Sequence, residues 1–269
     1  AGLTTQGTNA VAVGNQAGQT SQGIKAVSIG LLAGNDTQGD SSVAVGANAG
    51  KTTQGLSAVA VGNSAGKTSQ GVNSIAVGNS AGNDTQGIDS IAIGRSAGLT
   101  NQSANSVCLG DSSAVTGTLQ VQLGKSGTTT YAYGAVQDRS DERDKADIQD
   151  VHLGLDFIDA LSPKSYKFDY REDYRDHQED EEGNIIPDTR ELGEITHDGT
   201  HTRERLHCGL VAQEVKQVMD DLGVDFGGYQ DHSINGGQDV MSIGYGELIA
   251  PMIKAIQELK AEIEILKAS

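Results

Sequence analysis

The first 130 residues contain no aromatic side chain, since the seven Tyr and three Phe residues all lie between Tyr131 and Tyr245 and Trp is absent. An ordinary globular core is therefore excluded from this part of the chain. Gly, Ala, Val, Ser, Thr and Asn dominate it instead. Such a composition favours a thin, stacked structure whose core is only a few side chains wide. The length of 269 residues leaves room for a second domain.

Positive charge is scarce in the second half of the chain. Residues 139–269 hold fourteen Lys/Arg against thirty Asp/Glu, a net charge of −16, and residues 1–138 hold five against six, a net of −1, which together give −17. This balance argues against nucleic acid or an anionic membrane as a partner. We expect an acidic, solvated surface.

Cysteines and long apolar runs are also few. Cys108 and Cys208 lie one hundred residues apart, without ligand neighbours at zinc spacing. We predict isolated buried or inert thiols, no metal and no cofactor. No apolar run is long enough to cross a bilayer, so we expect no membrane insertion.

A sixteen-residue repeat organises the first half. Seven units begin at Ala1, Ala17, Ala33, Ala49, Ala65, Ala81 and Ala97, and a partial eighth at Val121–Gly124 is two residues out of phase. Within a unit, Val-Ala-Val alternates large, small, large, which predicts a strand with its branched side chains on one face. The following Gly, first Gly14, predicts a turn or a close backbone approach. A shorter polar strand is expected around Thr4–Gln6.

An exact register stacks like residues on like. Gln6, Gln22 and Gln38 should form a hydrogen-bonded ladder. The Val/Ile face needs neighbouring coils or chains to cover it, and a trimer would do so. Repeated Thr and Gln usually build a shaft. The alternative is ice binding by the array of Thr4, Thr20, Thr52, Thr68 and Thr100, which Asp36 and Asp84 interrupt.

Units such as Ser74-Ile75-Ala76-Val77-Gly78 resemble the head repeats of trimeric autotransporter adhesins. The resemblance covers residues 1–112 and implies a trimeric, left-handed parallel β-roll. Similar repeats occur in phage tail proteins, so the repeat by itself does not distinguish a bacterial from a viral protein.

Four blocks of the second half carry a second resemblance: Ser140–Ile148, Gly154–Pro163 with Ser165–Asp169, His207–Val215 and Tyr245–Leu259. In this order they resemble the intramolecular chaperone domain of phage tail spikes and fibres, the peptidase S74 family. The resemblance runs from residue 140 to about residue 267. The acidic stretch 170–205 is without clear counterparts.

The resemblance implies a domain that trimerises, assists folding of the preceding β shaft, and then cuts itself off. The cut would fall between Arg139 and Ser140, with Ser140 as nucleophile and Lys145 as general base. A Ser hydroxyl needs a base to attack an amide, and a Lys can serve. Outside this family, a Ser and a Lys five residues apart are usually unrelated. His207 is a candidate supporting residue, with a purely structural role as the alternative.

The last segment, 247–267, is expected to be a coiled-coil helix. Its apolar residues alternate three and four apart: Ile249, Met252, Ile256, Leu259, Ile263 and Leu266. This pattern is compatible with dimers, and the trimer comes from the resemblance. Residues 170–205 are expected to be either a disordered surface loop or an extended arm of the kind the family uses. Ile185-Ile186-Pro187, after Gly183, would then form the tip or return of a hairpin.

Together these features predict a mainly β shaft, a trimeric parallel β-roll (1–112), then a tip and cleavage linker (113–139) and a self-cleaving α+β chaperone domain (140–269). The chain would be the C-terminal part of a phage-type tail fibre or spike, folded in the host cytoplasm and carried on the virion after its chaperone domain is released. The alternative is a trimeric surface adhesin whose C-terminal domain only oligomerises. The expected partners are two further copies of the chain and a host receptor, a glycan or a surface protein. Tyr131 and Tyr133 are the candidate receptor contacts.

Overall fold

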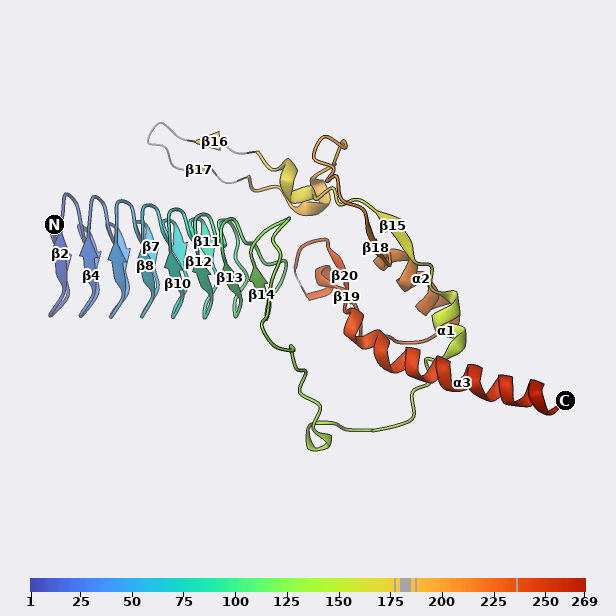
Figure 1. The fold of residues 1–269 in the computed structure, drawn as a ribbon. Coiled ribbons are helices and arrows are strands. Elements are labelled where there is room, and N and C mark those ends of the chain that lie inside the picture. The colour runs from blue at the N-terminus through green and yellow to red at the C-terminus, as the bar shows by residue number, and fades with distance from the viewer. Residues whose placement is uncertain (177, 180–184, 187, 236) are drawn as a thin grey trace. The chain divides into compact units, whose positions relative to one another are not determined.

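A computed structural model of the chain describes residues 1–176, 178–179, 185–186, 188–235 and 237–269. These residues form two compact units (Figure 1). The first unit comprises Ala1–Thr130, Tyr170–His197 and Ser233–Asp239, and the second comprises Tyr131–Asp169, Asp198–His232 and Val240–Ser269. The two are described separately.

The first unit contains a parallel β-solenoid of about seven turns, so the predicted shaft is confirmed. Each of the first six coils contributes one short strand to each of two sheets, and the seventh contributes a strand to one sheet and a single bridge, at Gln102, to the other. Strands of successive coils pair sixteen residues apart, as Val59 with Ile75. The six-stranded sheet consists of β1 (Thr5–Gln6), β3 (Ser21–Gln22), β5 (Thr37–Gln38), β7 (Thr53–Gln54), β9 (Ser69–Gln70) and β11 (Thr85–Gln86). The eight-stranded sheet consists of β2 (Val11–Val13), β4 (Val27–Ile29), β6 (Val43–Val45), β8 (Val59–Val61), β10 (Ile75–Val77), β12 (Ile91–Ile93), β13 (Val107–Leu109) and β14 (Val121–Leu123).

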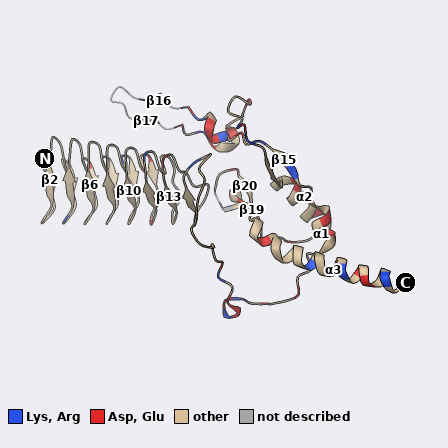
Figure 2. Ribbon diagram, viewed as in Figure 1, with Lys and Arg blue, Asp and Glu red and all other residues tan. Residues whose placement is uncertain are grey.

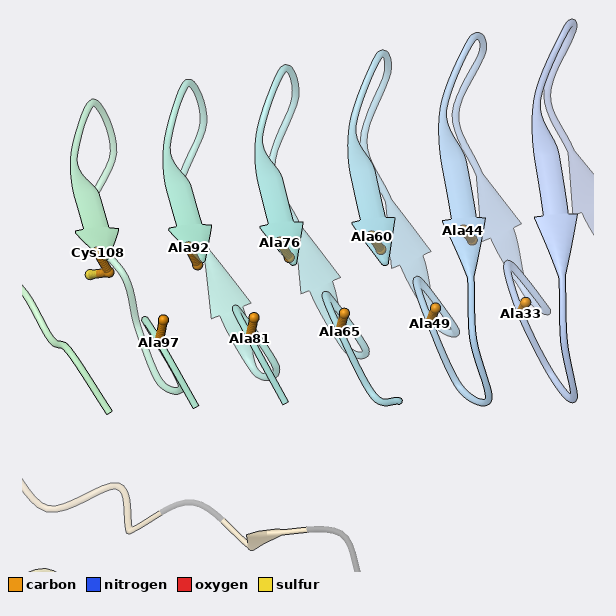
Figure 3. Packing of buried hydrophobic residues seen from close by; sticks show 10 residues of the cluster. All are labelled: Ala33, Ala44, Ala49, Ala60, Ala65, Ala76, Ala81, Ala92, Ala97 and Cys108. Carbon is orange, nitrogen blue, oxygen red and sulfur yellow. The ribbon is translucent and has the colours of Figure 1, made fainter. Parts of the chain in front are cut away.

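The interior of the solenoid is built from the smallest side chains. One row runs along the strands (Ala44, Ala60, Ala76, Ala92 and Cys108), and a second comes from the facing turns (Ala33, Ala49, Ala65, Ala81 and Ala97). The two rows point toward one another, and all ten residues are fully buried (Figure 3). Burial of Cys108 raises the pKa of its thiol, whereas Cys208 is exposed.

The branched side chains of the same strands point outward, as the alternation predicts. Val13, Ile29 and Ile93 remain 56%, 40% and 42% exposed in the single chain. The row of Val and Ile continues along the eight-stranded sheet, where its members in β6, β8 and β10 are half-buried, so the chain itself covers this long apolar face only in part. Such a face marks an association surface.

The glutamine ladder is present in the interior. Gln38 Nε2 donates to Gln54 Oε1 at 3.1 Å, and the same bond repeats from coil to coil as far as Gln102. Each Gln of the ladder also bonds to the longer strand of the preceding repeat unit, as when Gln54 Nε2 donates to the Val43 carbonyl at 2.7 Å. Gln6, in the first coil, is exposed and lies outside the ladder.

Ser28 interrupts the glutamine ladder at its N-terminal end, between Gln22 and Gln38. It occupies the position that Ala44 and its copies hold in other coils. Its hydroxyl accepts from Gln22 Nε2 at 3.3 Å and donates to Gln38 Oε1 at 2.6 Å. The hydroxyl thus relays the chain of hydrogen bonds that two glutamines make directly elsewhere.

Replacing one rung should destabilise the solenoid strongly. We expect Gln54→Leu to cost about 2–4 kcal/mol per chain, since it leaves buried partners such as Gln70 Oε1 without a donor. Gln6→Leu is the matched control and should cost less than about 1 kcal/mol, because Gln6 is exposed and makes one bond of 3.3 Å. Thermal unfolding followed by circular dichroism measures both. Equal melting temperatures would show that the ladder is not a source of stability.

The solenoid ends in a short, irregular coil. β14 pairs with β13 at an offset of fourteen residues, Val107 with Val121, which matches the two-residue phase shift of the partial repeat. Gln120 Oε1 closes this turn by accepting from the backbone N–H groups of Thr116 at 2.8 Å and Gly117 at 3.0 Å. On the outside, Asp111 pairs with Arg95 and Lys125.

Residues 170–197 of the acidic stretch belong to the first unit, and residues 198–205 belong to the second. The stretch contains β16 (Gln178–Glu179) and β17 (Ile185–Ile186), which pair antiparallel, and two 3-10 helices, Arg171–Tyr174 and Leu192–Glu194. After the two strands in the sequence, the side chain of Asp188 is buried and pairs with Arg190. Its hydrogen bond from the Arg190 guanidinium holds the pKa of the Asp188 carboxyl far below its usual range. Ile185 and Ile186 are in the second strand of this hairpin. Gly183 and Pro187 of the predicted hairpin lie outside the described residues.

The second unit is a small α+β arrangement, as expected. Its elements are β15 (Lys164–Tyr166) paired with β18 (His207–Gly209), β19 (Tyr229–Asp231) paired with β20 (Met241–Ile243), and helices α1 (Leu155–Ala160), α2 (Ala212–Leu222) and α3 (Ile249–Ala268). A 3-10 helix, Tyr245–Leu248, leads directly into α3. A further 3-10 helix, His232–Asn235, begins at the last residue of the segment 198–232 of the second unit and continues into the first unit. The core consists of Leu153, Phe157, Val215, Met219, Phe226 and Leu248.

Helix α3 caps the start of α1 in this unit. Glu258 Oε2 accepts from the backbone N–H of Leu155 at 2.7 Å, and so satisfies a free donor at the start of α1. Gly154 permits this approach, because a Cβ there would collide with the Glu258 carboxylate. The predicted seam residues of α3, by contrast, are exposed, with Ile256 at 65% and Leu266 at 73%. No helix among the described residues is long and apolar enough to span a membrane.

Candidate active site

A tight turn brings residues 140 and 145 together. Glu142–Asp144 form one turn of 3-10 helix, and Asp141 caps it by accepting from the Arg143 backbone N–H at 2.9 Å. Lys145 ends the turn, with its N–H donating to the Glu142 carbonyl at 3.1 Å. The backbone therefore reverses within five residues.

The turn places the side chains of Ser140 and Lys145 in contact. Lys145 Nζ donates to Ser140 Oγ at 2.7 Å, and both residues are exposed in the single chain. When the amine is neutral, the same pair can reverse, so that the hydroxyl donates and the amine accepts. That geometry is what a base-activated nucleophile requires. The two residues that the sequence singles out are thus adjacent.

Four charged residues in and beside the turn form two ion pairs. Figure 2 marks the charged residues of the whole chain by colour. Arg143 pairs with Asp141 at 2.6 Å, and these hydrogen bonds lower the pKa of the Asp141 carboxyl. Arg139 Nε pairs with Asp144 Oδ2 at 2.7 Å. The carboxylates of Asp141 and Asp144 are thus paired with arginines, and the Lys145 amine contacts the Ser140 hydroxyl.

Comparison with known families gives a match that begins at Ser140 itself. Residues 140–224 match the family model Peptidase_S74, chaperone of endosialidase. A segment that matches this family model thus follows the β-solenoid, as the sequence resemblance predicts, and the matched family implies autoproteolytic activity of the serine-peptidase type. The match includes the turn, α1, β15, β18 and α2. No curated protein matches the chain.

His207 lies within the matched residues 140–224, in an aromatic cluster. Its ring stacks on Tyr166 with centroids 6.2 Å apart and meets the edge of Phe168 at 4.8 Å. Among the described residues, no hydrogen bond joins His207 to Ser140 or Lys145. These contacts suit the structural alternative, in which His207 packs the β15–β18 pair.

The remaining candidates lie before the turn. Tyr131 and Tyr133 are in an extended segment without regular structure, and Tyr131 is 90% exposed. The described residues contain no group of three or more His, Cys, Asp or Glu side chains placed to hold a metal ion. Sequence reasoning missed the Arg139–Asp144 pair, whose only signal is opposite charge at a spacing of five residues.

Proposed function

We propose that this chain is the C-terminal part of a phage-type tail fibre or spike, and that its chaperone-of-endosialidase domain cuts the chain between Arg139 and Ser140. The observation that carries the proposal is the 2.7 Å contact between Ser140 Oγ and Lys145 Nζ, at the residue where the family match begins. Ser140 is the nucleophile and Lys145 the general base.

The reaction is an N-to-O acyl shift followed by hydrolysis. Ser140 Oγ attacks the Arg139 carbonyl carbon while its proton passes to neutral Lys145. The bond from that carbon to Ser140 N then breaks, and the nitrogen takes the proton back from Lys145. Water hydrolyses the resulting ester, which leaves a carboxylate on Arg139 and a free hydroxyl and amine on Ser140. The chain itself supplies the proximity of the reacting atoms.

The wild-type protein provides the direct test. A denaturing gel of freshly expressed protein should show two fragments, and N-terminal sequencing of the C-terminal one should begin at Ser140. A chain that stays whole while it trimerises would favour the alternative, an adhesin whose C-terminal domain only oligomerises.

Assembly as a homotrimer is the second part of the proposal. In one chain the outward Val/Ile face of the solenoid is apolar and partly exposed, and the seam of α3 is apolar and exposed. Copies in parallel register would cover both. A solenoid with a sixteen-residue repeat loses little by slipping one coil, so a C-terminal domain that associates first would set the register. Its removal would then leave the fibre kinetically stable.

We expect light scattering to give a mass of three times 27.9 kDa, about 84 kDa, for the uncut chain. Ile256→Asp places a charge in the seam and should shift the protein toward monomer. Ile265→Asp is the matched control, since Ile265 is equally exposed on α3, at 69%, but lies outside the seam. A stable wild-type monomer at micromolar concentration, or equal effects of the two substitutions, would contradict this assembly.

Cutting would also make residues 131–139 the C-terminal end of the fibre fragment. Tyr131 and Tyr133 are the aromatic residues of that fragment and both are exposed. We propose them as contacts to a host-surface receptor, because aromatic side chains supply contact area for glycans and proteins. After the cut the chaperone domain would be released, and the finished fibre would remain on the virion.

A further inference from the structure

Two side-chain contacts bracket the peptide bond at the proposed cut. Ser140 meets Lys145 at 2.7 Å, and the preceding residue, Arg139, meets Asp144 at 2.7 Å. Both contacts span five residues across the same 3-10 turn. The residues on either side of the bond are therefore each held by one residue at the far end of the turn.

We propose that Asp144 is a positioning residue for self-cleavage, which acts through Arg139. Its carboxylate anchors the guanidinium of Arg139, and this fixes the rotation of the Arg139 carbonyl relative to Ser140 Oγ. The inference rests on the proposed cut between Arg139 and Ser140.

The other charges of the turn support this assignment. Asp141 is occupied by Arg143 through two hydrogen bonds of 3.0 Å and 2.6 Å, so Asp144 is the acidic partner that Arg139 takes. The same pairing occupies the carboxylate next to Lys145 in the chain. Without Arg139, that carboxylate would be available to the lysine amine and would draw it away from the serine hydroxyl.

A double-mutant cycle on the cleavage rate of the full chain tests the role of Asp144. The pair is exposed, with side chains 81% and 40% accessible, so we expect Asp144→Asn and Arg139→Gln each to slow cleavage about three- to fivefold. The double variant should be no slower than either single variant, because both substitutions remove the same contact, the ion pair between Arg139 and Asp144. High salt should slow the wild type and leave Asp144→Asn unchanged.

Glu142→Gln is the matched control. It removes a neighbouring negative charge from the same turn, and its side chain makes no hydrogen bond or ion pair within the described part of the chain, so its rate should equal that of the wild type. The reversed pair, Arg139→Asp with Asp144→Arg, should recover a rate within about twofold of the wild type, whereas Arg139→Asp alone stays slow.

The outcomes separate this inference from the cut itself. A wild type that never cuts would refute the proposed function and the inference with it. Equal cleavage rates for the wild type and Asp144→Asn would overturn the positioning role alone. So would a double variant whose slowdown equals the product of the slowdowns of the two single variants.

Discussion

Ser140→Ala is expected to leave the chain in one piece under conditions that cut the wild type to completion. Alanine has no oxygen to attack the Arg139 carbonyl, and the acyl shift has no other route in the turn. We expect the rate to fall at least about a thousandfold, as when the nucleophile is removed from a serine hydrolase. A gel time course with N-terminal sequencing measures it.

The uncut variant should keep its fold and assembly, because Ser140 is exposed and its side-chain contact is with Lys145. Ser162→Ala, at another exposed serine of the second unit, is the control and should cut normally. Ser140→Cys should retain some cleavage, because a thiol is also a nucleophile. Fragments of Ser140→Ala with the same new N-terminus at residue 140 would show that an outside protease makes the cut.

Lys145 should be nearly as important, for a different reason. Lys145→Ala removes the amine that contacts the hydroxyl at 2.7 Å, so the serine would have to lose its proton to water. Lys145→Ala should therefore lose most of the rate of cleavage, because a general base must be in contact with the hydroxyl to take its proton. The same gel time course measures this loss. A variant that cuts at the wild-type rate would assign the base to another group.

Most of the solenoid could be predicted because its sequence repeats every sixteen residues, so that equivalent residues of successive units lie side by side. Val59 and Ile75 share a position in the repeat, and the structure pairs them in one register. The same argument places Gln54 beside Gln70. Ser28 shows the limit of this reasoning. The sequence marks it as a departure from Ala, but only the interior geometry shows that its hydroxyl lies between two glutamines.

The fold of the second unit is harder to predict from the sequence, because the contacts that hold it together join residues far apart along the chain. The pattern around Glu258 suggested the flank of a coiled coil, yet its carboxylate also caps α1 from 103 positions away. No local periodicity encodes such a contact. The Ser140–Lys145 pair lies within one turn, and its residues were selected by family resemblance, because a spacing of five carries little information by itself.

The glycine after each long strand should tolerate no side chain, and Gly62 shows why. Its φ is +130°, a region that L-residues rarely adopt, and a Cβ there would lie 2.5 Å from the carbonyl oxygen of Gly78 in the next coil. The position is thus both a turn and a close backbone approach, the two roles that the repeat pattern left open. Because the neighbouring atom is backbone, it cannot move without opening the stack.

Gly62→Ala should therefore destabilise the solenoid by about 3–5 kcal/mol per chain, the sum of backbone strain and overpacking. For a domain of this size the loss corresponds to a melting temperature lower by roughly 10 °C or more. Gly134→Ala is the matched control, since a Cβ there would meet no atom within 4 Å and its φ lies outside the left-handed region. Circular dichroism melts of both variants should differ clearly. If Gly62→Ala melts with the control, the coils must be able to separate at this corner, and the close stacking of Gly62 on Gly78 is not what holds them together.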